Sequence, residues 1–179
     1  MKPTKTGITG QIEMSSKINM VIGIVVAFLL MLVIASTLME GMKIVYEKLS
    51  ISKAGGKVGV KAFFEVETPL PFMVYAFPDN GRMTDFKVDG GSSVNSPVGF
   101  LILSTRRNLT VEYSEPASSR FEYSLLTARS WLKPIGTLEI NVESDTPFNS
   151  NYPITQKEAF KSNNYWPQEN LVLWFPATS

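Results

Sequence analysis

The chain has 179 residues and a formal net charge of +1, and it contains no cysteine and no histidine. The nearly neutral charge gives no electrostatic basis for binding nucleic acid. The missing cysteines exclude disulfides, thiolate metal sites and cysteine nucleophiles, and the missing histidines remove the usual general base near neutral pH. We therefore expect no nucleic-acid partner, no metal and no cofactor.

The first segments of the chain are a short polar tail, residues 1–17, and an uncharged apolar stretch, residues 18–39. About 22 residues in a helix extend roughly 33 Å, enough to cross a hydrocarbon core about 30 Å thick. A cleaved signal peptide has a shorter apolar region. A buried globular helix rarely needs about 22 uncharged residues. A pilin-like segment is a further alternative, although such a leader is cleaved directly before its apolar run, whereas polar residues precede this one. The pattern predicts a retained single-pass transmembrane helix in a lipid bilayer.

Lysines lie on both sides of the predicted span, at Lys2, Lys5 and Lys17 before it and at Lys43, Lys48, Lys53 and Lys57 after it. This near balance leaves the orientation open under the positive-inside rule. We expect a cytoplasmic tail and an external domain, or a place in a virion membrane. Asn108 begins an Asn-Leu-Thr triplet that matches the N-glycosylation pattern and fits an external domain.

Two features of this region suggest helix packing. Gly23 and Ala27 are four residues apart, a spacing of small residues that permits close approach of membrane helices. Met42, Val45 and Leu49 have the spacing of one helical face, which predicts that the helix continues to about residue 52. This stripe would pack against the chain's own domain or against a partner helix. The glycine-containing segment 53–57 is predicted to be a hinge.

The remainder, residues 58–179, is predicted to be a mainly β, antiparallel, sandwich-like domain. Short alternating or continuously apolar runs are separated by turn residues, as in β-sandwiches. The expected strands are 58–66, 72–77, 83–88, 98–104, 109–113, 121–125, 138–142 and 171–175. Residues 144–170 are expected to be irregular, with one helical turn starting at the capping-box spacing of residues 155–158.

Three aromatic residues near the end of the chain are candidates for an interface: Trp166, Trp174 and Phe175. The plainer interpretation is that they close the core of the sheet. The functional one is that they contact a partner, since tryptophan is enriched among the residues that dominate binding energy at interfaces.

Catalytic motifs for nucleotide binding, metalloproteases and α/β-hydrolases are missing from the sequence. Ser50 and Lys53 have the spacing of a Ser/Lys pair, and the anchor with a β domain is similar to membrane-bound signal peptidases in architecture only. Asp79, Asn80, Asp85 and Asp89 could supply oxygen ligands to Ca²⁺, although Asp-Gly and Asn-Gly are also ordinary turn residues. Glu112, Glu115 and Glu122 are candidate acids for glycoside hydrolysis, which needs two carboxylates that face one cleft. Glu112 and Glu122 lie on the non-core phase of neighbouring predicted strands, which favours a solvated face instead.

These patterns together indicate a non-enzymatic, membrane-anchored structural or assembly subunit of a larger complex. Such a complex would be a secretion, pilus or motility apparatus, or a membrane-containing virion, and the other subunits could include further copies of this chain. The alternatives are a membrane-tethered ligand-sensing domain that acts through a partner, and a carboxylate-based hydrolase.

Overall fold

The computed structural model describes residues 25, 42–97, 99–126 and 133–176. Apart from Val25, the predicted span 18–39 with Gly23 and Ala27 lies outside the described residues. Within those residues, no helix has the length and apolar character needed to cross a membrane. The chain divides into two units between Met39 and Glu40, and the second unit is described below.

The described residues of this unit form twelve strands. Their bounds are β1 (Lys43–Ala54), β2 (Lys57–Glu67), β3 (Met73–Phe77), β4 (Thr84–Asp89), β5 (Ser92–Ser96), β6 (Gly99–Ser104), β7 (Asn108–Pro116), β8 (Arg120–Tyr123), β9 (Ile135–Ser144), β10 (Asn149–Ser150), β11 (Phe160–Tyr165) and β12 (Leu171–Trp174). The expected mainly β class is therefore confirmed.

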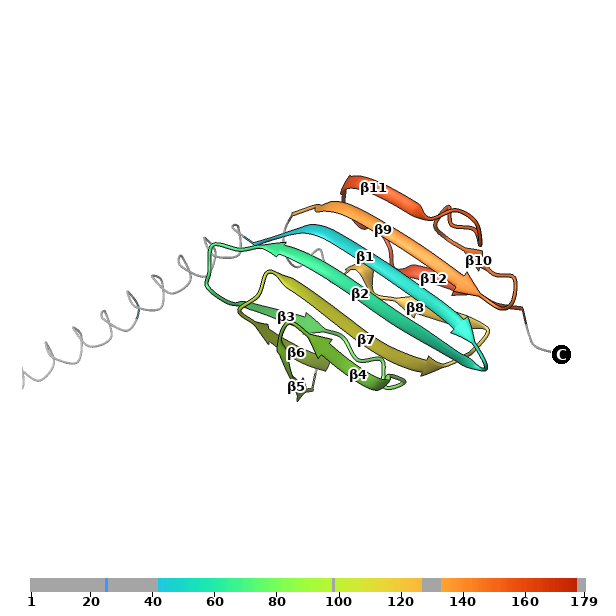
Figure 1. Cartoon of the computed structure of the whole chain (residues 1–179), viewed down its shortest axis with the longest axis horizontal. Helices are drawn as coiled ribbons and strands as arrows, with labels where there is room; N and C mark the ends of the chain where they lie inside the picture. The colour runs from blue at the N-terminus through green and yellow to red at the C-terminus, as the bar shows by residue number, and fades with distance from the viewer. Residues whose placement is uncertain (1–24, 26–41, 98, 127–132, 177–179) are drawn as a thin grey trace, which may run out of the picture. The chain divides into compact units, whose positions relative to one another are not determined.

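The strands are arranged in one large sheet and two small ones (Figure 1). The large sheet has six strands in the order β11-β9-β1-β2-β7-β4, and the small sheets have the orders β10-β12-β8 and β3-β6-β5. All pairings are antiparallel except that of β1 with β9, which is parallel. The prediction of a purely antiparallel domain is wrong at this pair.

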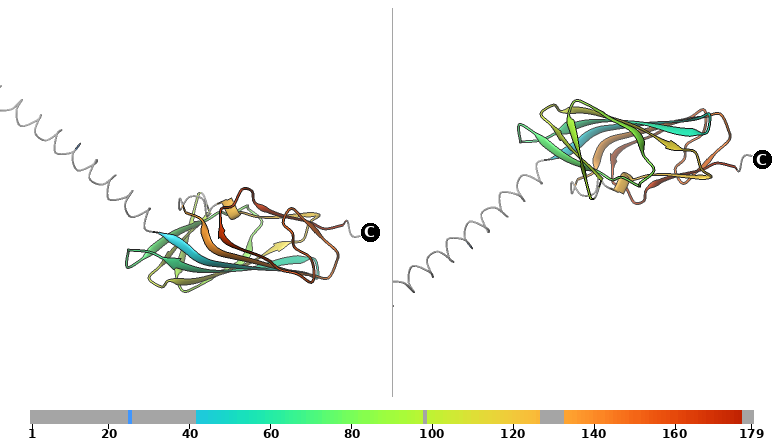
Figure 2. Two further views of the ribbon diagram at one scale, coloured as in Figure 1. Left: turned by 90° about the horizontal axis from the view of Figure 1, so that it is seen from above. Right: turned by 90° about the horizontal axis from the view of Figure 1, so that it is seen from below.

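The core lies between the large sheet and the two small sheets, which occupy the same side of it (Figure 2). Along β2, Val58, Val60, Ala62, Phe64 and Val66 are buried, and the residues between them face away from the core. They pack with residues from both small sheets, such as Tyr75 of β3 and Leu173 of β12, in one cluster. The two-layer arrangement agrees with the predicted sandwich.

Residues 43–54 form a strand, so the predicted continuation of the helix to about residue 52 is wrong. Strand β1 lies inside the large sheet, with β2 on one side and β9 on the other. Leu49 is fully buried in the core, whereas Met42 and Val45 are only partly buried, and the register of β1 with β2 shifts between Ile44 and Tyr46. The three residues therefore do not form one helical stripe. The burial alternates instead, as a strand with one face on the core requires.

The predicted hinge is a tight β-hairpin turn. Gly55 and Gly56 have φ angles of 58° and 79° and join β1 to β2, with Ala54 opposite Lys57. Two consecutive positive φ angles match the two-residue turns that follow the twist of a hairpin, and glycine adopts them without a steric penalty.

The section 144–170 is less irregular than expected, because it contains β10 and β11. The Thr155 hydroxyl accepts hydrogen bonds from the backbone N–H groups of Lys157 and Glu158, at 3.2 and 3.1 Å. These are capping contacts, but the chain then enters β11 at Phe160 instead of a helix. The predicted helical turn is therefore wrong, since pairing of β11 with β9 determines the backbone there.

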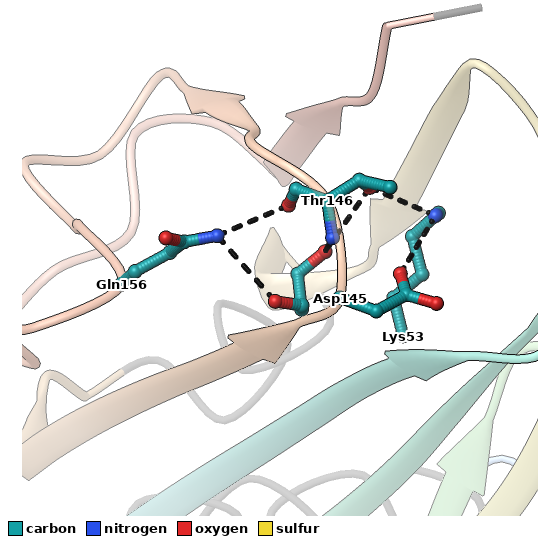
Figure 3. A network of polar contacts seen from close by, with 5 residues as sticks. Lys53, Asp145, Thr146 and Gln156 are labelled. Atoms are coloured by element: carbon teal, nitrogen blue, oxygen red, sulfur yellow. Dashed lines mark hydrogen bonds and ion pairs between the residues drawn. The ribbon is translucent and has the colours of Figure 1, made fainter. Parts of the chain in front are cut away.

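A cluster of polar contacts holds this section to the end of β1 (Figure 3). The Lys53 amine donates to Asp145 at 3.2 Å and to the Thr146 hydroxyl at 2.9 Å. The Gln156 amide donates to the carbonyl oxygens of Ser144 and Thr146. These bonds satisfy the buried amine of Lys53 and link β1, the turn after β9 and the loop before β11.

Candidate interaction surface

The outer face of the small β3-β6-β5 sheet carries a continuous strip of apolar side chains. It consists of Val74, Ala76, Val94, Leu101 and Leu103, all exposed. Val74 lies opposite Leu103, and Leu101 lies between Ala76 and Val94 in the sheet. The inner residues of the same strands, such as Tyr75 and Ile102, fill the core. The strip is therefore apolar surface that the chain's own core does not cover.

Strand β5 ends this sheet and is the most exposed of its strands. It pairs with β6 on one edge, and no strand pairs with its other edge in the part of the chain that the structure describes. Its sequence, SSVNS, contains no charge and no proline, and Val94 at its centre is 67% exposed. Natural edge strands are commonly protected by lysine, proline or a bulge, and β5 has none of these groups. An open edge beside an apolar strip is suited to strand addition by a second chain.

A second exposed region lies at one end of the domain, which we call the proximal end. There β1, β7 and β9 begin and β2, β4 and β11 end, as the strand registers require. The loop after β2 brings Phe72 to this end, 44% exposed, and the loop after β6 brings Arg106 and Arg107. A hydrogen bond from the Val66 N–H to the Arg107 carbonyl, 2.8 Å long, fixes the second loop beside β2.

The outer face of the large sheet is polar and contains a hollow of about 710 Å³ over β9, β1, β2 and β7. Two ion pairs join neighbouring strands on this face: Lys48 contacts Glu139 at 2.9 Å, and Lys61 contacts Glu112 at 2.6 Å. The hydrogen bond from Lys48 is the largest of the effects that lower the pKa of Glu139 to about 2. This face resembles a solvated sheet surface with cross-strand ion pairs.

Two of the three candidate acids line another hollow, of about 550 Å³, whose floor includes Tyr113 and Tyr123. Glu115 is buried and accepts a hydrogen bond from the Asn80 amide at 2.8 Å. Glu122 is exposed and contacts Arg120 at 2.7 Å. Glu112 lies elsewhere, on the outer face of the large sheet. The structure therefore brings two of the three acids to one hollow, each with a cation or an amide as its partner.

A buried carboxyl group that the sequence analysis missed lies on β1. Glu47 is 2% exposed and faces the core, and the Tyr123 hydroxyl donates to it over 3.4 Å. Desolvation raises the pKa of Glu47 to about 8, and the hydrogen bond from Tyr123 opposes this increase. On a helix with Met42, Val45 and Leu49 on its packing face, Glu47 would lie on the opposite face, whereas the alternation of strand β1 turns Glu47 toward the core.

The other candidate residues for chemistry are separated or occupied. Ser50 and Lys53 lie on opposite faces of β1, because three residues along a strand reverse the direction of the side chain. The Asp79 and Asn80 side chains accept hydrogen bonds from the backbone N–H groups of Gly81 and Arg82, which is turn chemistry. Among the described residues, no group of three or more acidic side chains could hold a metal ion.

The three candidate interface aromatics have different environments. Phe175 is 5% exposed, packs in the core and has the Lys53 amine 5.1 Å from its ring centroid, so its interpretation as an interface residue is wrong. Trp174, the preceding residue, points the other way from β12 and is 42% exposed. Trp166 is partly buried after β11. Of the three, Trp174 presents the most surface to a partner.

No protein-family model matches the chain, and no curated protein matches its sequence. We therefore base the functional proposal on the surfaces described above.

Proposed function

We propose that this chain is a non-enzymatic, single-pass membrane-anchored assembly subunit of a larger membrane-associated complex. The complex would be a secretion, pilus or motility apparatus, or a membrane-containing virion. The observation that carries the proposal is the exposed apolar strip of the β3-β6-β5 sheet, which ends at the open edge of β5. Exposed apolar patches of this kind mark contact sites for other proteins or for membranes.

The partner that fits the edge of β5 best is a second copy of the same strand. Two copies of β5 can pair antiparallel about a two-fold axis, and full overlap of residues 92–96 then places Val94 opposite Val94 of the second copy. The uncharged sequence SSVNS brings no like charges together in this arrangement. Pairing would also bring the two Val94 side chains into contact on the face that carries the apolar strip. The two small sheets would become one sheet that continues across both chains.

The side-chain chemistry supports a structural role over a catalytic one. The exposed acids Glu112 and Glu122 have cationic partners in Lys61 and Arg120. A carboxylate hydrolase needs two acids that face one cleft with different pKa values. Of the three candidate acids, Glu115 and Glu122 line one hollow, and each already has a partner there, the Asn80 amide for Glu115 and Arg120 for Glu122.

Single-cysteine scanning tests the proposed dimer, because the chain has no cysteine of its own. We would introduce one cysteine at each position from Ser92 to Ser96 in the full chain in membranes and oxidise mildly. Residues directly opposite in an antiparallel pair have Cα atoms about 4.5 to 5.5 Å apart, which a disulfide can span. The expected result is a strong cross-linked dimer for Val94→Cys and a weak one for Ser92→Cys, whose copies are about 13 Å apart in this register.

Lys57→Cys, in the hairpin at the other end of β1, is the control for random collision. Cross-linking at every position including Lys57, or at none of the five β5 positions, would show that β5 does not pair with its copy. A dimer that is lost on Leu101→Asp while the monomer stays folded would support the proposal further.

A second candidate function is ligand binding by a membrane-tethered domain, and the hollow above Tyr113 and Tyr123 favours it. The hollow combines aromatic rings with Glu115, Arg82 and Arg120, a mixture that suits a small polar ligand. A chain that stays monomeric in mild detergent, without β5 cross-links, would favour this function over assembly.

A further inference from the structure

Few residues separate the predicted membrane span from the first strand of the β domain. The span is predicted to end at Met39, and β1 begins at Lys43. Four residues of extended chain cover at most about 14 Å. If residues 18–39 cross the bilayer, the start of β1 must lie within about 14 Å of the membrane surface. The proximal end is the end of the domain that contains this point.

The proximal end carries exposed apolar side chains on the side of the small β3-β6-β5 sheet. Met73 and Ser104 form the last pair of β3 and β6 at this end, and Val74 and Leu103 form the next. Leu103 is 52% exposed, and Phe72 lies one residue before β3. Phe72, Val74 and Leu103 are therefore three large, exposed apolar side chains at the proximal end.

Charges at the proximal end are distributed unevenly. Arg106 and Arg107, both exposed, follow β6 and lie on the side of the apolar residues. The acids Glu65 and Glu67 alternate with the buried Val66 and therefore lie on the opposite, outer face of the large sheet, where Lys43 pairs with Glu67 in the register. Further charges at this end, among the described residues, are Asp89, the last residue of β4, Lys133, before β9, and the exposed Glu169, in the loop between β11 and β12. Arginines next to apolar groups are suited to the interface of a bilayer, because their stems contact apolar surface while the guanidinium groups reach phosphates.

We propose that this proximal tip, formed by Phe72, Val74, Leu103, Arg106 and Arg107, lies in the headgroup region of the bilayer. The inference rests on the proposed membrane anchor and adds a direct contact between the β domain and lipid. The contact limits tilting of the domain on its short connection. It also holds β5 at a constant height above the membrane, so two copies in one bilayer can meet edge to edge.

The test uses the full chain reconstituted in vesicles of phosphatidylcholine with a fraction of phosphatidylserine. A fluorophore is attached to a single cysteine at Phe72, and quenching by lipids with a spin label near the headgroup is compared with quenching by a water-soluble quencher. The control is the same label at Lys57, about 35 Å away along β2. The expected result is several-fold stronger lipid quenching at position 72 than at position 57. The same fluorophore on Leu103→Cys should show the same strong lipid quenching as the label at position 72. Agreement between the two positions would show that the label at position 72 does not itself cause the contact.

The outcomes separate this inference from the proposed anchor. In one outcome the vesicles retain the protein after alkaline washing, but the labels at positions 72 and 103 are quenched only by the water-soluble quencher, as at position 57. This result would leave the anchor intact and refute the tip contact. Protection of both labels from water and from lipid would mean that protein covers the tip, which also refutes it. Release of the chain by alkaline washing would refute the anchor and the tip contact together.

Discussion

Replacing Glu47 by glutamine should stabilise the β domain at neutral pH and remove much of the pH dependence of its stability. The Glu47 carboxyl lies in the core between β1 and β8, where Tyr123 is its hydrogen-bond partner. Burial makes the charged form unfavourable, so the pKa in the folded state is raised from 4.5 to about 8. Glutamine has the shape of the protonated acid and does not ionise.

The sign follows from the number of bound protons. Between pH 4.5 and 8 the folded state keeps a proton on Glu47 that the unfolded chain has released. The free energy of unfolding therefore falls as the pH rises through this window, and the fall stops above about pH 8. At 1.36 kcal/mol per pKa unit, this group costs about 3 kcal/mol at pH 7 and about 1 kcal/mol at pH 5. Glu47→Gln should recover most of that difference at pH 7 and almost none at pH 4.

The measurement is urea unfolding of the full chain in a nonionic detergent at pH 4, 5.5, 7 and 8.5. Tryptophan fluorescence reports on the β domain, because all three tryptophans follow residue 130. Glu122→Gln, which changes an exposed carboxyl group, is the matched control and should not reproduce the effect. A wild-type stability that is constant or rises between pH 5 and 8, or a Glu47→Gln variant no more stable at pH 7, would refute the reasoning.

Three further substitutions test the packing. Gly136→Ala places a Cβ 2.4 Å from the Val45 carbonyl oxygen, where β9 pairs with β1. This variant should lose about 1 to 3 kcal/mol of unfolding free energy in the same urea titration. A loss below about 0.5 kcal/mol would contradict this close approach. Phe175→Ala should cost about 3 to 5 kcal/mol because it empties a buried site, whereas Trp174→Ala should cost under about 1 kcal/mol. Equal losses at these adjacent positions would contradict the assignment of Phe175 to the core.

Local pattern was sufficient for the strands whose side chains alternate or form an apolar run. The alternation from Val58 to Val66 predicts β2, and the turn residues around Asn80 correctly separate β3 from β4. These features depend on residues a few positions apart, so the sequence carries them directly. Strands β5 and β11 were missed, since polar edge strands show little periodicity.

The candidate surface could be predicted only in part. The apolar runs of β3 and β6 predict buried strands, but one face of each remains exposed, because no strand among the described residues packs over Val74 and Leu103. From the sequence, Trp174 and Phe175 were equal candidates for an interface. In the structure the side chain of Phe175 points into the core and that of Trp174 points outward. Which side chains of a strand face the core depends on how that strand pairs with its neighbours, so it is decided only in the assembled sheet.

The sequence alone determined the β character of the domain, the absence of cysteine and histidine chemistry, and the prediction of a membrane span. Tertiary structure decided the conformation of residues 43–54, because Met42, Val45 and Leu49 fit a helical spacing while Ile44, Leu49 and Ile51 fit the core face of a strand. The pairing of β1 with β9, about ninety residues later, resolves this ambiguity. It supplies backbone hydrogen bonds on the second edge of β1, and it turns Glu47 into the core, which no local pattern could have shown.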